Sequence, residues 1–99
     1  FRAARARFSA LDLALLPICP IAPREHMQRV HMDPGEALRA FSLLGATYMV
    51  PIHFDTFLNS DDRPGECGRV LERERRAQQL DQRRVARLQI GEQRVLLAR

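Results

Sequence analysis

Two histidines, His31 and His53, are the side chains of this sequence best suited to chemistry. A neutral imidazole is a common zinc ligand, and it also exchanges a proton near neutral pH. The chain holds three histidines, and no two of them have the short spacing of a metal motif. A histidine near a strand end is more often structural than a ligand, so residue type alone leaves both roles open.

Other catalytic patterns are missing around these histidines. The sequence contains no G-x-S-x-G, no P-loop and no G-x-G-x-x-G. Asp55 lies two residues after His53, where we favour a turn residue over a reactive one. Glu36 is better placed to cap a helix than to act as a base. The histidines therefore carry the chemical hypothesis.

A helix is expected directly after His31. Asp33 can cap it, Pro34 suits its first position and Glu36 completes a capping box. Apolar residues then recur at helical spacing, at Ala37, Leu38, Phe41 and Leu44. Gly45 supplies the left-handed residue at which such a helix ends.

Two apolar runs, 11–18 and 47–54, flank this helix and have the length of strands. Their continuous apolarity predicts buried strands, the first covered on both faces. A helix over 11–18 stays open locally, although Pro17 and Pro20 oppose it. Pro51 places the second strand near an edge or an end. A strand, helix, strand order predicts a parallel pair, with His53 near its carboxyl end.

The flanking segments are less regular. Residues 1–10 suggest the end of a helix, and 19–30 a loop. A helix is expected over 66–82, with Glu72 and Arg76 as an ion pair on its wet side. Its thin apolar stripe is Cys67, Val70, Leu71 and Ala77. Residues 85–90 and 93–97 flank Gly91 and predict a small hairpin.

The charge is uneven along the chain. All 16 basic residues are arginine; residues 1–62 carry a net charge of −1 and residues 63–99 one of +5. A basic helix face could meet nucleic acid, anionic lipid or an acidic partner, although a solvated face explains it as well. No aromatic platform accompanies these arginines, which counts against nucleic acid. They are Arg69, Arg73, Arg75, Arg76, Arg83, Arg84 and Arg87.

The number and spacing of the cysteines bear on the cellular compartment in which the protein works. Cys19 and Cys67 match no metal or redox spacing, and two cysteines do not indicate a secreted disulfide scaffold. No apolar run approaches the ~20 residues of a membrane helix. We therefore expect a cytoplasmic or membrane-peripheral protein.

Three blocks then carry a family resemblance. They are LDLALLPI, HMDPGEALRAFSLLGA and MVPIHFDTF, in this order and with consistent spacing over residues 8–57. They resemble the C-terminal part of the metallo-β-lactamase-fold hydrolases, and within these the N-acyl-phosphatidylethanolamine-hydrolysing phospholipase D branch and its bacterial relatives. That branch typically shows LPIG, Pro-Arg, His-Met-Asp-Pro-Glu-Glu-Ala and His-Trp-Gly-Thr-Phe in the corresponding places.

The resemblance implies an α/β fold, the C-terminal portion of a four-layer αββα sandwich, in which residues 1–99 form a partial domain. It implies dinuclear zinc and hydrolysis of a phosphodiester, phospholipid or lactone-like substrate. His53 matches the last metal-ligand histidine, and His31 a histidine beside the substrate phosphate. Arg24, of the Pro-Arg pair, would bind substrate. Asp33 and Pro34 match structural cap positions.

Several positions depart from the pattern. Asp55 replaces a glycine beside the metal, and Cys19 replaces the glycine after LPI. Glu25-His26 stands where an aromatic pair is usual. The hallmark H-x-H-x-D-H motif is absent from these 99 residues. We therefore expect a fragment that binds zinc weakly, is inactive alone, and pairs with a missing N-terminal half or self-associates. A basic binding module or a degenerate structural remnant is the alternative.

Overall fold

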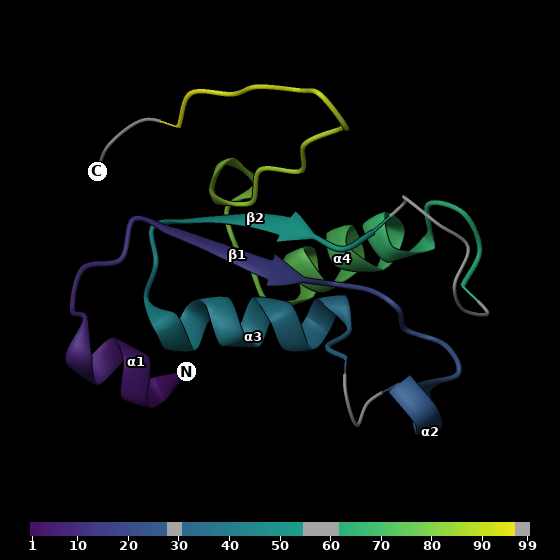
Figure 1. Ribbon diagram of the computed structural model, residues 1–99, viewed down its shortest axis with the longest axis horizontal. Coiled ribbons are helices and arrows are strands. Elements are labelled where there is room, and N and C mark those ends of the chain that lie inside the picture. The colour runs from purple at the N-terminus through teal and green to yellow at the C-terminus, as the bar shows by residue number, and fades with distance from the viewer. Residues whose placement is uncertain (28–30, 55–61, 97–99) are drawn as a thin grey trace.

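A computed structural model describes residues 1–27, 31–54 and 62–96, and the side chains of residues 26 and 27 are not among what it describes. Its elements follow one another along the chain as drawn in Figure 1. They are α1 (Arg2–Arg7), β1 (Leu13–Pro17), α2 (Arg24–Met27), α3 (Pro34–Leu44), β2 (Tyr48–Ile52), α4 (Glu66–Ala77) and the 3₁₀ helix η1 (Gln82–Arg84).

The two strands pair in parallel, with Leu13 opposite Tyr48 and Pro17 opposite Ile52. The crossover between them is α3, as the strand, helix, strand order predicts. On the other edge of β2, Val85 forms a bridge with Met49. Pro51 is the next-to-last residue of β2, so the missing N–H falls near the strand end, as expected.

Helix α3 begins and ends as the sequence predicts. The Asp33 carboxylate accepts a hydrogen bond from the Glu36 N–H at 2.8 Å, and the Glu36 carboxylate accepts one from the Asp33 N–H at 3.0 Å. At the other end Gly45 has φ 70°, and its N–H donates to the carbonyls of Phe41 and Ser42. Both ends are therefore fixed by residues within one turn of them.

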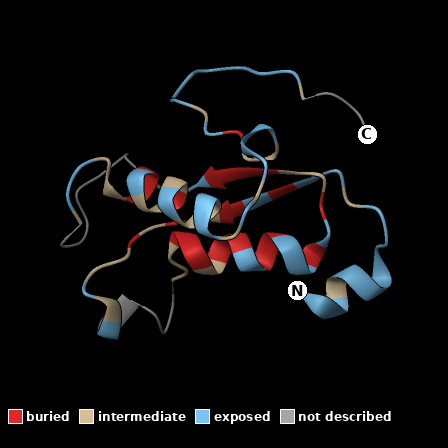
Figure 2. Ribbon diagram, turned by 180° about the vertical axis from the view of Figure 1, so that it is seen from behind, coloured by how far each residue is buried: buried red, intermediate tan, exposed pale blue. Residues whose placement is uncertain are grey.

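The core lies between α3 and one face of the sheet, where buried positions cluster in Figure 2. Phe41 and Leu38 of α3 and Met49 of β2 are fully buried. The opposite face of β1 differs from expectation, because Leu13 is 45% and Leu15 57% exposed. The prediction that this strand is covered on both faces is wrong for the described chain, since α3 covers only the face of Ala14 and Leu16.

Two helical predictions also need correction. The expected loop over 19–30 contains α2, a single turn. Helix α4 ends at Ala77 rather than 82, because Gln79 adopts a left-handed φ of 56°. Cys67 and Leu71 are buried as the stripe predicts, whereas Ala77 is exposed.

The predicted hairpin is not formed within residues 85–96. A turn is present, because the Glu92 N–H donates to the Gln89 carbonyl at 3.0 Å, but no strand flanks it. Ile90 and Val95 are each 88% exposed. Two strands without a packed apolar face are marginal in water, and the segment instead places Val85 beside β2.

Candidate functional site

The fold brings His31 and His53 together. His53 directly follows β2, and His31 lies just before the cap of α3. Their rings stack, with centroids 5.7 Å apart and planes inclined by 20°. The carboxyl end of β2 and the amino end of α3 lie at the same end of the sheet (Figure 1). The strand, helix, strand connection therefore brings the two histidines close together.

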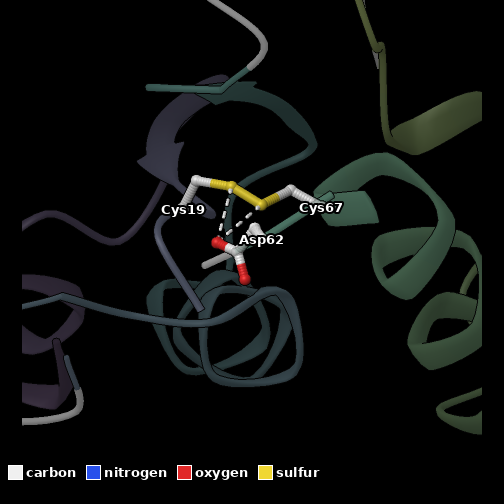
Figure 3. Close-up of side chains that lie close together, drawn as sticks. All are labelled: Cys19, Asp62 and Cys67. Carbon is white, nitrogen blue, oxygen red and sulfur yellow. Dashed lines mark hydrogen bonds between the residues drawn. A yellow bond between two sulfur atoms is a disulfide. The ribbon is translucent and has the colours of Figure 1, made fainter. Parts of the chain in front are cut away.

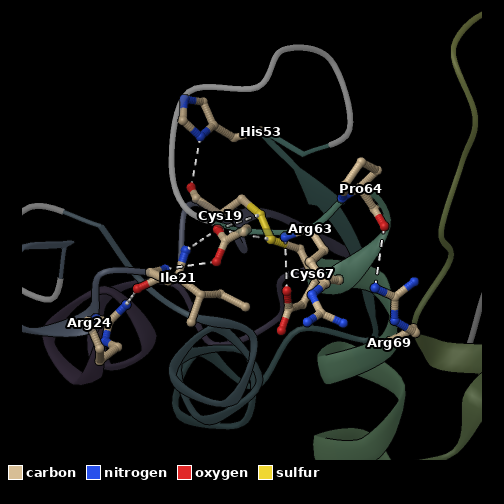
Figure 4. The surroundings of a disulfide bond; sticks show 11 residues. Cys19, Ile21, Arg24, His53, Arg63, Pro64, Cys67 and Arg69 are labelled. Atoms are coloured by element: carbon tan, nitrogen blue, oxygen red, sulfur yellow. Dashed lines mark hydrogen bonds between the residues drawn. A yellow bond between two sulfur atoms is a disulfide. The ribbon is translucent and has the colours of Figure 1, made fainter.

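The orientation of His53 is fixed by a backbone contact. Its Nδ1 lies 2.8 Å from the carbonyl oxygen of Cys19 (Figure 4). Because a carbonyl only accepts, we infer that Nδ1 carries the proton and that the neutral ring keeps its lone pair on Nε2. His53 also has φ 65°, a left-handed conformation that is uncommon outside glycine. Such conformations cluster at functional sites.

Arg24 holds the backbone of the other histidine. Its Nη2 donates to the His31 carbonyl at 3.0 Å and to the Glu36 carboxylate at 2.9 Å. Its Nε lies 3.7 Å from the Asp33 carboxylate. The guanidinium therefore ties His31 to the first turn of α3, a contact that the sequence did not predict. Asp55, the remaining predicted site residue, lies outside the described residues.

An open groove of about 780 Å³ adjoins His53. It runs between the end of β2, the start of α4 and residues 87–90, and its lining includes Phe54, Arg69 and Arg87. The Arg87 guanidinium lies close to Gly68 of α4, where an added Cβ would be 2.6 Å from its Nη1. The groove thus combines an imidazole with two guanidinium groups, which suits an anionic ligand.

Much of the predicted basic face is engaged within the chain. Arg75 donates from Nε to Glu72 at 3.1 Å, and this hydrogen bond is the main reason that the pKa of Glu72 is lowered. The expected pair of Glu72 with Arg76 is present at 3.3 Å. Arg83 hydrogen bonds to Asp81 and lowers the pKa of that carboxyl to about 2.

A disulfide joins Cys19, just beyond β1, to Cys67 in the first turn of α4, with the Cα atoms 6.1 Å apart. Figure 3 shows the carboxylate of Asp62 beside both sulfurs. Sequence reasoning missed this pairing, because its only signal is the presence of two cysteines and their separation of 48 residues matches no motif.

Zinc needs at least three protein ligands around one point. Among the described residues, the one group that offers three close ligand atoms is Cys19, Asp62 and Cys67, whose atoms lie within 4.8 Å of one another. Among these described residues, no third potential ligand lies close enough to the two stacked histidines to share a metal ion with them. The described residues therefore do not complete a zinc site around His53.

Comparison with known protein families identifies the superfamily of this chain. A family model described as a beta-lactamase superfamily domain matches residues 2–54, slightly more than half of the chain. The chain belongs to the beta-lactamase superfamily. The match runs from α1 to the residue after His53, so it includes both histidines and Arg24.

Membership supports the metallo-β-lactamase fold and a relation to its hydrolases, and the parallel α/β unit is compatible with it. Helix α4 and the residues after it lie outside the matched range. Within the described residues, no helix has both the length and the apolarity to cross a membrane.

Proposed function

We propose that this chain is the C-terminal portion of a zinc-dependent hydrolase of the beta-lactamase superfamily, from the phospholipase D-like branch. The observation that carries the proposal is the histidine pair: two imidazoles from different elements stack at one end of the parallel strands, within the family match. The sandwich would be completed by residues outside this chain. The half-exposed Leu13 and Leu15 support this, because a second sheet would cover them.

In this proposal His53 supplies one zinc ligand through Nε2. Metal-binding histidines usually donate their other ring N–H to a carbonyl or carboxylate, and the Cys19 carbonyl occupies that position. The remaining zinc ligands come from residues outside the described chain.

His31 would contact the phosphoryl or carbonyl oxygen of the substrate, with Arg24 fixing the position of its backbone. Because the Arg24 guanidinium is paired with Glu36 and lies near Asp33, its proposed part in substrate binding is to position His31. The groove beside His53, with Arg69 and Arg87, supports an anionic substrate such as a phosphodiester or phospholipid over a neutral lactone.

The test compares this chain, kept in its disulfide form, with a version extended upstream in its own reading frame. Zinc content and hydrolysis of an activated phosphodiester are measured for both. The short chain should bind zinc weakly and show no turnover, whereas the extended chain should hold zinc and turn over. His53→Ala in the extended chain should lower both, and Arg76→Gln, on the exposed side of α4, should change neither.

Tight stoichiometric zinc in the disulfide form of the short chain would contradict the proposal. So would an extended chain that neither binds zinc nor hydrolyses the ester. In that case the alternative, a basic module that binds a phosphate-bearing ligand through the groove, is favoured. Its affinity for such a ligand should fall steeply as the salt concentration rises.

A further inference from the structure

We propose that Cys19, Asp62 and Cys67 form a metal site controlled by the redox state of the two cysteines. With the disulfide reduced, the two thiolates and the carboxylate bind one thiophilic divalent ion such as Zn²⁺. Oxidation to the disulfide removes the ligands and releases the ion. This site is separate from the histidine pair, and the proposal does not depend on the proposed hydrolase activity.

The spacing of the three groups fits a single ion. Asp62 Oδ2 lies 3.9 Å from the sulfur of Cys19 and 3.9 Å from that of Cys67 (Figure 3). Zinc bonds of about 2.3 Å to sulfur and 2.1 Å to oxygen, at tetrahedral angles, place such ligand atoms about 3.6 Å apart. Reduction frees the sulfurs to separate, and a water molecule can take the fourth position.

The carboxylate is already held in place. The N–H of Ile21 donates to Oδ2 at 2.6 Å, and the N–H of Ala22 donates to Oδ1 at 2.8 Å. Hydrogen bonds of this kind orient metal ligands and are commonly needed for affinity. Cys67 is buried and Cys19 is half-buried, so the ligands lie at the edge of the core rather than on open surface.

The charges of the reduced state also favour a cation. Two thiolates beside a carboxylate would carry three negative charges, which a divalent ion reduces to one. Reduction by a dithiol transfers two electrons and two protons, giving two protein thiols and the oxidised dithiol. Metal binding then releases two protons as the metal–sulfur bonds form. A disulfide oxidant reverses the sequence by taking two electrons from the thiolates, and the metal leaves as the sulfur–sulfur bond forms.

In both states the end of β1 stays tied to the first turn of α4, through sulfur–sulfur bonding or through the metal. The switch therefore exchanges one cross-link for another. His53 contacts this region through the Cys19 carbonyl and not through the sulfur.

The experiment uses the 99-residue chain, reduced with a phosphine that is then removed under inert gas. Co²⁺ is added first, because cobalt bound by thiolates gives a sulfur-to-metal charge-transfer band, and Zn²⁺ is then used to displace it. The reduced chain should bind one ion, show the band, and have both thiols protected from alkylation. The disulfide form should show neither effect.

Two variants separate the ligand set. Asp62→Asn keeps one oxygen, enough for one of the two backbone donors, but loses the charge. It should weaken metal binding at least tenfold, the order expected when a ligand environment is lost. Arg76→Gln, on the exposed side of α4, should leave the band and the affinity unchanged. If the reduced chain shows no band and no thiol protection, the site does not exist.

Equal affinity in Asp62→Asn, or loss of the band in Arg76→Gln, would overturn the proposed ligand set. The disulfide form of Asp62→Asn is compared with the original chain by circular dichroism to establish that it folds. If that variant does not fold, the ¹¹³Cd resonance of the unaltered reduced chain decides, because coordination by two sulfurs and oxygen is shifted well away from coordination by nitrogen and oxygen alone.

Discussion

Reducing the Cys19–Cys67 disulfide should lower the free energy of unfolding by about 4 kcal/mol. The cross-link closes a segment with a sequence separation of 48 residues. Chain-entropy arithmetic for a loop of that size gives a loss of about 14 cal/mol/K in the unfolded chain, or about 4 kcal/mol at 25 °C. Because α4 lies outside the β1–α3–β2 unit, reduction also removes the covalent link that holds it there.

This loss is large for so small a chain. Domains of this size have total stabilities of about 5–15 kcal/mol. A change of 1 kcal/mol moves the melting temperature of a domain with 60–100 residues by about 4–8 °C, so reduction should lower it by roughly 15–30 °C. The reduced chain should therefore keep about 1–11 kcal/mol of stability, and only at the lower end of that range is a measurable fraction unfolded at 25 °C.

Urea unfolding followed by circular dichroism measures the effect, in the disulfide form and in the reduced form with a chelator present. The variant Cys19→Ser with Cys67→Ser should behave like the reduced chain, and reductant should change it no further. A difference under about 1 kcal/mol would refute the reasoning, because it would mean that the unfolded chain is already constrained or that α4 needs no tie. Adding Zn²⁺ to the reduced chain should recover part of the loss if the metal site exists.

Three further outcomes follow from local features. Asp33→Ala should cost about 0.5–2 kcal/mol in urea unfolding, because the capping box of α3 is lost, and Asp33→Asn should cost less. Phe41→Ala should cost about 3–5 kcal/mol, since this ring is fully buried, and thermal unfolding should show the chain near its stability limit. Asp81 should titrate near pH 2 by NMR, because the hydrogen bonds from Arg83 lower its pKa to about 2 in the folded chain. Since the folded pKa is depressed, the contribution of Asp81 to the free energy of unfolding is present above about pH 4 and is lost as pH falls through 2. Arg83→Gln should return this pKa toward its ordinary value.

The elements nearest the site follow from signals that span only a few residues. Asp33, Pro34 and Glu36 determine where α3 begins, and Gly45 determines where it ends, because capping acts within one turn. The two apolar runs and the helix between them lead to a parallel pair, since a crossover of that length permits it. The same blocks indicate the superfamily, and they lie almost wholly within the matched range.

Tertiary structure decided how distant residues meet. The stacking of His31 on His53 depends on where α3 and β2 end relative to one another. The pairing of Cys19 with Cys67, and the place of Asp62 beside them, depends on how α4 packs against α3. No local pattern encodes such contacts, because they are selected by the packing of a core that forms only when the whole chain folds.

The two wrong predictions, of a first strand covered on both faces and of a C-terminal hairpin, have the same cause. An alternating or continuous apolar run predicts a strand, but only a neighbouring layer determines whether each face is covered. Leu13 and Leu15 stay half-exposed because α3 covers the other face, and Ile90 and Val95 form no hairpin because they have no apolar surface to pack on. The sequence by itself determined the bounds of α3, the parallel pair of strands and the superfamily. The partners of each side chain were decided by packing, because burial is a property of the assembled fold.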